Sequence, residues 1–177
     1  MLWELSAGWL IALNILAWAV VHMATAWGIT QLAAGRFDPS GWLFHQRRWE
    51  RGGQVYELLL RVQRWKSRLP DGAALFRGGF RKKRFVSRDP DYLRRFVRET
   101  CRGELAHWST VAAAPLFFLW NPPHVGAVMI LYALLASLPF IVVQRYNRFR
   151  IERLLERRER AQRPDRLPPS TVPALES

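Results

Sequence analysis

The sequence predicts an all-α integral membrane protein with three transmembrane helices, an interfacial amphipathic helix and a basic cytoplasmic loop. Half of its 177 residues are hydrophobic although its formal net charge is +13, an unusual combination for a soluble globular domain. The two properties are also segregated, because all 27 Lys and Arg residues fall within 36–102 and 145–166. We expect one membrane domain over residues 1–160, followed by a disordered Pro-rich tail over 161–177.

The first predicted span covers residues 8–34, which contain no charged side chain. A helix needs about 20 apolar residues to cross the hydrocarbon core, so this run is long enough. A cleaved signal peptide is disfavoured, because no basic segment precedes the run and it is too long for one. Asn14, His22 and Thr25 lie within about a quarter of the helix circumference. We expect this polar face to turn toward the other spans, with helix packing favoured over substrate binding.

The other two spans, at about 105–120 and 125–144, are predicted to form a helical hairpin. The paired prolines of "NPP" (121–123) separate them, because proline cannot continue a helix. The earlier span is short for a bilayer, and Trp108 and Trp120 would anchor its ends in the interface.

The distribution of basic residues predicts the orientation. Lys and Arg near membrane ends are retained in the cytoplasm, and three spans place 36–102 and the C-terminal tail on one side. The protein is therefore expected to be multi-pass in the cell (inner) membrane, with its N-terminus outside and its C-terminus cytoplasmic. This rule already explains the charge, so nucleic-acid binding is not expected. The single cysteine excludes a disulfide framework.

Helices are also predicted beyond these spans, and one of them runs into the span 105–120. Residues 54–69 have apolar side chains near helical spacing among charges, which favours an amphipathic helix in the headgroup region. Asp89 is a suitable N-cap and Pro90 suits the first helical position, so a helix is expected to run from there to about residue 120. The basic stretch 148–163 is also predicted to be helical.

Glu104 and His107 lie where the basic segment 36–102 gives way to the second apolar region. Three residues apart, they share a helix face, so the carboxylate can reach the imidazole. Such a pair can act as an oriented general base, or it can be a solvated helix end whose side chains reach the interface. A di-iron site needs two Glu-x-x-His copies and only one is present, so no metal is expected. Cys101 is disfavoured as an acyl-accepting nucleophile, because no histidine is placed to activate it except His107, almost two turns away.

Three motifs resemble, in order and spacing, the glycosyl-4,4'-diaponeurosporenoate acyltransferase family. They are "RVQRWKSRLPDG" (61–72), "RETCRGELAHW" (98–108) and "LPFIVVQRYNRFR" (138–150), within a similarity that covers about 42–160. The resemblance implies transfer of a fatty acyl group to the sugar primary hydroxyl of a glycosylated carotenoid acid. It implies no bound cofactor, with acyl-CoA or acyl carrier protein as acyl donor. The partners implied are a lipid-soluble glycosylated acceptor, membrane lipids and other carotenoid-pathway enzymes.

For that reaction we expect His107 to be the general base and Glu104 to orient it. Arg102, Arg145 or Asn147 would neutralise the oxyanion, and Lys66 with the cluster 81–84 would bind the phosphates or acidic surface of the donor. The full set expected to bind substrate is Trp65, Lys66, Asp71, Arg102, Arg145, Tyr146, Asn147 and Arg148. The alternative is a non-catalytic membrane protein whose basic surface recruits anionic lipid or a pathway partner.

Overall fold

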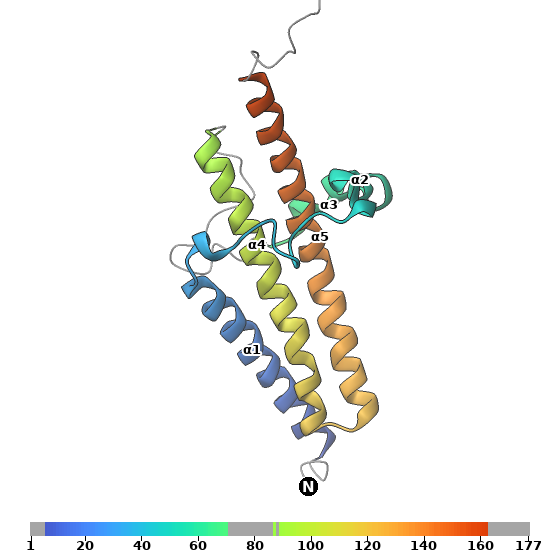
Figure 1. Ribbon diagram of the computed structural model, residues 1–177. Helices are drawn as coiled ribbons and strands as arrows, with labels where there is room; N and C mark the ends of the chain where they lie inside the picture. The colour runs from blue at the N-terminus through green and yellow to red at the C-terminus, as the bar shows by residue number, and fades with distance from the viewer. Residues whose placement is uncertain (1–5, 71–86, 88, 163–177) are drawn as a thin grey trace, which may run out of the picture.

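The computed structural model describes residues 6–70, 87 and 89–162, and over these residues all regular secondary structure is helical. Three long helices dominate, namely α1 (Ala7–Gln31), α4 (Pro90–Ala113) and α5 (Pro123–Ala161). Helices α4 and α5 run side by side in opposite directions, and α1 crosses α4 at an angle (Figure 1). The all-α prediction is therefore confirmed for the described part of the chain.

Helices α1 and α5 are long and apolar enough to cross a membrane. The predicted span at 105–120 forms the second half of α4 and the short 3-10 helix η6 (Ala114–Leu119) that continues it. This agrees with the expected helix from Pro90 to about residue 120, which joins the basic first half of α4 to the span 105–120. Its crossing of the membrane remains a prediction.

Helix α4 begins where the sequence predicts. The Asp89 side chain accepts a hydrogen bond of 3.0 Å from the Tyr92 backbone N–H, and Pro90 occupies the first turn. Helix α5 differs from the prediction in extent, since the span 125–144 and the basic helix 148–163 form a single helix that contains Pro139. The basic end of α5 therefore continues as helix beyond its apolar part. The predicted disorder of 161–177 concerns residues that, after the first two, lie outside the described ranges.

The single amphipathic helix predicted over 54–69 is wrong. The segment forms α2 (Gln54–Leu60), α3 (Val62–Trp65) and the 3-10 turn η4 (Lys66–Arg68), and Arg61 adopts left-handed backbone angles of φ 48° and ψ 46°. On a continuous helix, Tyr56 and Val62 would point about 120° apart, because six residues rotate the chain by about 600°. The reversal at Arg61 lets both side chains pack against α5, where they form a buried cluster with Tyr146 and Phe149.

The polar face of α1 turns toward the hairpin, as the sequence predicts. The amides of Asn14 and Asn121 exchange hydrogen bonds of 2.9 and 2.8 Å, and both side chains are buried. The hydroxyls of Thr25 and Thr110 lie 3.3 Å apart, while the His22 ring lies 6.4 Å from that of Tyr132. Buried amide pairs need such partners in an apolar setting, so Asn14 serves helix packing.

Candidate active site

Two carboxylates and two guanidinium groups form a buried cluster at the level where the apolar part of α5 ends. This charge tetrad consists of Glu50, Glu104, Arg145 and Arg148. The side chains of Glu50, Glu104 and Arg148 are fully buried, and that of Arg145 is 12% exposed. The formal charges sum to zero, which allows four ionised groups to be buried together without a net charge in low dielectric. Three segments distant in sequence meet at this point.

Glu104 links both arginines. Its Oε1 accepts a bond of 2.7 Å from Arg145 Nη1, and its Oε2 accepts one of 2.6 Å from Arg148 Nη2. The indole N–H of Trp108 donates a third bond of 3.3 Å to Oε1. Glu104 therefore joins α4 to α5 through ion pairs with two arginines of α5.

The imidazole of His107 lies one helical turn further along α4. It is half-buried and stacks on Phe140, with 4.7 Å between ring centroids. The Glu104 carboxylate bonds Arg145, Arg148 and Trp108. The two residues predicted as a pair thus share a helix, but the carboxylate turns toward the arginines of α5.

All five N–H donors of Arg145 have acceptors within the protein. Its Nε and one Nη2 donor bind Glu50, at 2.7 and 3.1 Å, and one Nη1 donor binds Glu104. The two remaining donors bind the carbonyl oxygens of Leu43 at 3.0 Å and His45 at 3.1 Å. Arg145 therefore fastens residues 43–50 to α5, and in this arrangement it has no donor left for a substrate.

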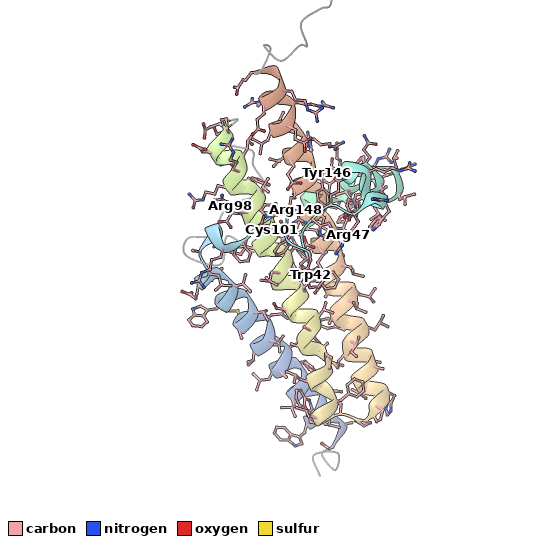
Figure 2. The ribbon with its side chains drawn as sticks, in the orientation of Figure 1. Trp42, Arg47, Arg98, Cys101, Tyr146 and Arg148 are labelled. Carbon is pink, nitrogen blue, oxygen red and sulfur yellow. The ribbon has the colours of Figure 1, made fainter. Side chains whose placement is uncertain are left out.

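Arg148 is bonded much less completely. Besides its bond to Glu104, its Nη1 approaches the Cys101 sulfur at 3.6 Å, and its Nε has no hydrogen-bond partner within the described residues. The guanidinium also lies 5.7 Å from the ring of Phe44 and 5.2 Å from that of Phe149. Figure 2 shows Arg148 and Cys101 together between α4 and α5. A buried N–H without an acceptor is costly, so Nε is the unsatisfied donor of this cluster.

Glu50 is the member of the tetrad that the sequence did not reveal. Tyr56 donates a short hydrogen bond to Oε1, and the backbone N–H of Arg47 donates one of 2.5 Å to Oε2. Burial alone would raise the pKa of Glu50, but the bonds from Arg145, Tyr56 and Arg47 outweigh it and hold the pKa below its ordinary value. Burial and this carboxylate raise the pKa of Tyr56. Within "RRWERGG", the sequence around Glu50 gives little indication of a functional role, because the Arg145 partner of this carboxylate lies 95 residues away.

A second group brings together Lys66, Tyr146 and Asn147 from the predicted set. Lys66 Nζ donates a 3.2 Å bond to Asn147 Oδ1 and lies 5.0 Å from the centre of the Tyr146 ring. The Tyr146 hydroxyl accepts a 2.7 Å bond from Gln63. Burial, with the nearby positive charge of Arg150, lowers the pKa of Lys66. Lys66 is therefore a partly buried cation that lies against the Tyr146 and Asn147 side chains of α5.

The remaining predicted substrate-binding residues lie apart from the tetrad or outside the described residues. Arg102 pairs with Glu99 at 2.7 Å and donates to the Leu32 carbonyl at 3.4 Å, at the end of α1. The Trp65 indole N–H donates to the Leu60 carbonyl at 2.8 Å, and its ring packs on the cluster beside Lys66. Asp71 and the basic cluster 81–84 lie outside the described ranges.

Neither metal nor thiol chemistry is indicated by the described residues. No group of three or more His, Cys, Asp or Glu side chains that could hold a metal ion occurs in this part of the chain. Cys101 is fully buried, and burial raises the pKa of its thiol to about 11 despite the nearby positive charge of Arg148. A buried, protonated thiol is a poor nucleophile.

Comparisons with known proteins show the family to which the chain belongs. Residues 40–157, which contain the tetrad and His107, match the family model described as glycosyl-4,4'-diaponeurosporenoate acyltransferase. Proteins of that name from Staphylococcus aureus strains bovine RF122 / ET3-1 and MRSA252 are 30% identical over 138 residues, and that from strain USA300 is 29% identical. Each alignment covers 78% of this chain and 83% of the relative. No solved structure matches the chain significantly. The chain therefore belongs to the glycosyl-4,4'-diaponeurosporenoate acyltransferase family, a family of acyl-transferring enzymes.

Proposed function

We propose that this protein is a membrane O-acyltransferase that esterifies the sugar primary hydroxyl of a glycosylated carotenoid acid, or of a similar glycolipid. The observation that carries the proposal is the family match over residues 40–157, because it contains every described residue of the candidate site. The location of the charge tetrad at the end of the apolar part of α5 supports it. A reaction between a lipid-soluble acceptor and a charged acyl donor needs a site at the membrane surface.

In the proposed reaction, His107 is the general base. As the sugar hydroxyl attacks the thioester carbonyl carbon of the donor, its proton moves to the imidazole and a C–O bond forms. The tetrahedral intermediate carries the negative charge on the former carbonyl oxygen. Its collapse breaks the C–S bond, and the leaving thiolate takes the proton from His107. No separate acyl-enzyme is required, which agrees with the burial of Cys101.

The contacts in the structure change the roles proposed for the neighbouring charges. Arg148 is the better candidate for stabilising the oxyanion, because its Nε–H has no acceptor while every donor of Arg145 is used. Glu104 then acts by holding Arg148 and Arg145 in place, one helical turn from His107, rather than by binding the imidazole. Arg145 acts as a positioning residue, since it joins the segment 43–50 to α5.

The group around Lys66 is proposed to receive the acyl donor. The ammonium is partly buried, bonds the neutral amide of Asn147 and feels the negative charge of Glu57 without an ion pair to it among the described residues, so it can bind a phosphate or a carboxylate. Either acyl-CoA or the acidic surface of acyl carrier protein offers such a group. Arg102 and Trp65 would contribute at the edges of the same cytoplasmic face.

The membrane arrangement is proposed from the charge distribution and the two spans that the helices allow. With α1 and the α4–η6–α5 hairpin in the bilayer, the N-terminus lies outside and the basic ends of α4 and α5 lie in the cytoplasm. His107 and the tetrad then lie near the cytoplasmic surface of the cell membrane, where soluble acyl donors are available.

The experiment that tests the proposal uses the purified full-length protein in nanodiscs. It is incubated with a glycosylated carotenoid acid and with palmitoyl-CoA or palmitoyl acyl carrier protein, and the lipid extract is analysed by mass spectrometry. Ester product is expected with wild type and strongly reduced product with Arg148→Met. The matched control is Arg98→Met, which changes an exposed arginine on the same helix as Glu104. Absence of ester with every donor would favour the non-catalytic recruiting role instead.

A further inference from the structure

Five large apolar side chains on the segment between α1 and α4 are exposed and close together in sequence. This apolar rim consists of Trp42, Trp49, Leu58, Leu59 and Leu60, whose exposed fractions range from 47% to 77%. They lie outside the helices α1 and α5 that can cross a membrane. Large exposed apolar surface of this kind marks a contact with another apolar phase or partner.

The backbone under the apolar rim is fixed to the helices. Arg145 donates hydrogen bonds to the carbonyl oxygens of Leu43, the neighbour of Trp42, and of His45. It also bonds Glu50, the neighbour of Trp49. Gly53, with φ +84°, approaches α5 so closely that a Cβ there would lie 3.3 Å from that of Phe149. The backbone that carries the exposed side chains is therefore fixed against α5.

The contacts with α5 give the depth of the apolar rim. The apolar part of α5 ends before Arg145, which bonds the residues next to Trp42. Tyr56 of α2 packs at Tyr146 and Phe149, at most four residues further, which corresponds to about 6 Å along the helix axis. The headgroup layer beyond the hydrocarbon core is roughly 5–7 Å thick on each side. With the edge of the hydrocarbon core at Arg145, these contacts place the backbone that carries the rim within the interfacial layer. Figure 2 shows Trp42, Arg47 and Tyr146 in this order along the side of α5.

Exposed arginines surround the apolar rim. They are Arg48, Arg51, Arg61, Arg64 and Arg68. Within the described residues 32–70, the acidic residues that are not buried are Asp38 and Glu57, so this part of the surface is strongly positive. Aromatic and leucine side chains beside arginine suit a lipid interface with anionic headgroups, since the rings and the apolar chains enter the boundary while guanidinium groups bind phosphate.

We propose that the apolar rim is embedded in the cytoplasmic leaflet at the boundary between headgroups and acyl chains, with the flanking arginines on anionic phospholipid headgroups. The inference rests on the membrane orientation given under the proposed function and not on acyl transfer itself. Because Arg145 bonds both the segment that carries the rim and the charge tetrad, a rim embedded in the interface would hold the tetrad at a fixed depth in the membrane.

The test uses environment-sensitive bimane labels on engineered cysteines in full-length protein, reconstituted at one copy per nanodisc. The test position is Leu59→Cys. Leu135→Cys, exposed in the apolar part of α5, is the membrane-buried control, and Glu159→Cys, exposed near the end of α5, is the aqueous control. Wild type gives the labelling background, because Cys101 is its single cysteine and is buried. Lipids with a nitroxide at acyl carbon 5 or carbon 12 serve as quenchers.

The proposal predicts that the Leu59 label is quenched by the carbon-5 nitroxide at least about threefold more than the Glu159 label, and less by the carbon-12 nitroxide than the Leu135 label. Replacing phosphatidylglycerol by phosphatidylcholine is expected to weaken the quenching at Leu59 but not at Leu135. A Leu59 label quenched no more than the Glu159 label overturns the proposal. So does a Leu59 label that becomes protected only when two copies share a nanodisc, since that result identifies a protein contact. Both readouts are independent of acyl-transfer activity.

Discussion

Replacing Glu104 by glutamine tests the charge tetrad directly. The variant Glu104→Gln keeps the size of the side chain but changes the formal charge of the buried cluster from zero to +1. The carboxylate is fully buried and binds two guanidinium groups at 2.7 and 2.6 Å. Removing one partner of a buried ion pair costs about 3–5 kcal/mol, because the remaining charge is left without compensation. We expect a loss of that size in the free energy of unfolding.

A surface ion pair provides the matched control. Glu159 bonds Arg94 at 3.3 Å, and both side chains are more than half exposed. Exposed pairs contribute about 0–1 kcal/mol, so Glu159→Gln is expected to change stability by less than that. The measurement is SDS titration of the purified protein in mixed micelles, followed by circular dichroism.

A second substitution separates charge balance from packing. The double variant Glu104→Gln/Arg148→Met returns the buried cluster to zero net charge. It is expected to be more stable than the sum of the two single variants predicts, by at least about 1 kcal/mol. If Glu104→Gln costs less than about 1 kcal/mol, or if the two losses simply add, the tetrad is not an energetically coupled unit and the reasoning is refuted.

Three further predictions concern other groups. Because the folded protein holds the pKa of Glu50 below its ordinary value of 4.5, the stability that it contributes is present above that pH and is lost as pH falls through the folded-state pKa. Circular dichroism from about pH 6 to pH 3 should show a steeper loss of stability for wild type than for Glu50→Gln, and equal slopes would contradict this. Cys101, buried with its pKa raised to about 11, should resist iodoacetamide at neutral pH until SDS unfolds the protein, and Cys101→Ala should retain activity, whereas rapid labelling of the folded protein would refute its burial. Gly126→Ala should destabilise the hairpin by about 1–3 kcal/mol, since its Cβ would come within 2.5 Å of the Phe118 ring, and Phe118→Leu should recover part of the loss. No loss in the single variant, measured by the same SDS titration, would show that the ring moves freely.

The helical framework follows from local sequence signals. The charge-free run that contains Asn14, the Asp89 cap and the prolines at 122–123 each act within a few residues, so the helix starts and the hairpin turn can be predicted. The polar stripe of α1 was predicted for the same reason, because helical periodicity places Asn14 and Thr25 on one face. The bounds were less predictable, since α5 continues past its apolar part without a local stop signal.

The candidate site depends on contacts that local patterns do not encode. The sequence placed Glu104 and His107 on one helix, but the direction of the Glu104 carboxylate is set by Arg145 and Arg148, which lie more than 40 residues away. The importance of Glu50 depends on the same arginine. The left-handed turn at Arg61 was missed because the apolar spacing of that segment also fits a straight helix, and only packing against α5 decides between the two conformations.

The most direct test of the central claim is the initial rate of ester formation by His107→Gln, measured by mass spectrometry in nanodiscs and normalised to folded protein. Loss of a general base lowers the rate by about 10²–10⁴. The account predicts a decrease in that range in the rate at saturating substrate. A variant that keeps more than about a tenth of the wild-type rate would contradict His107 as the base.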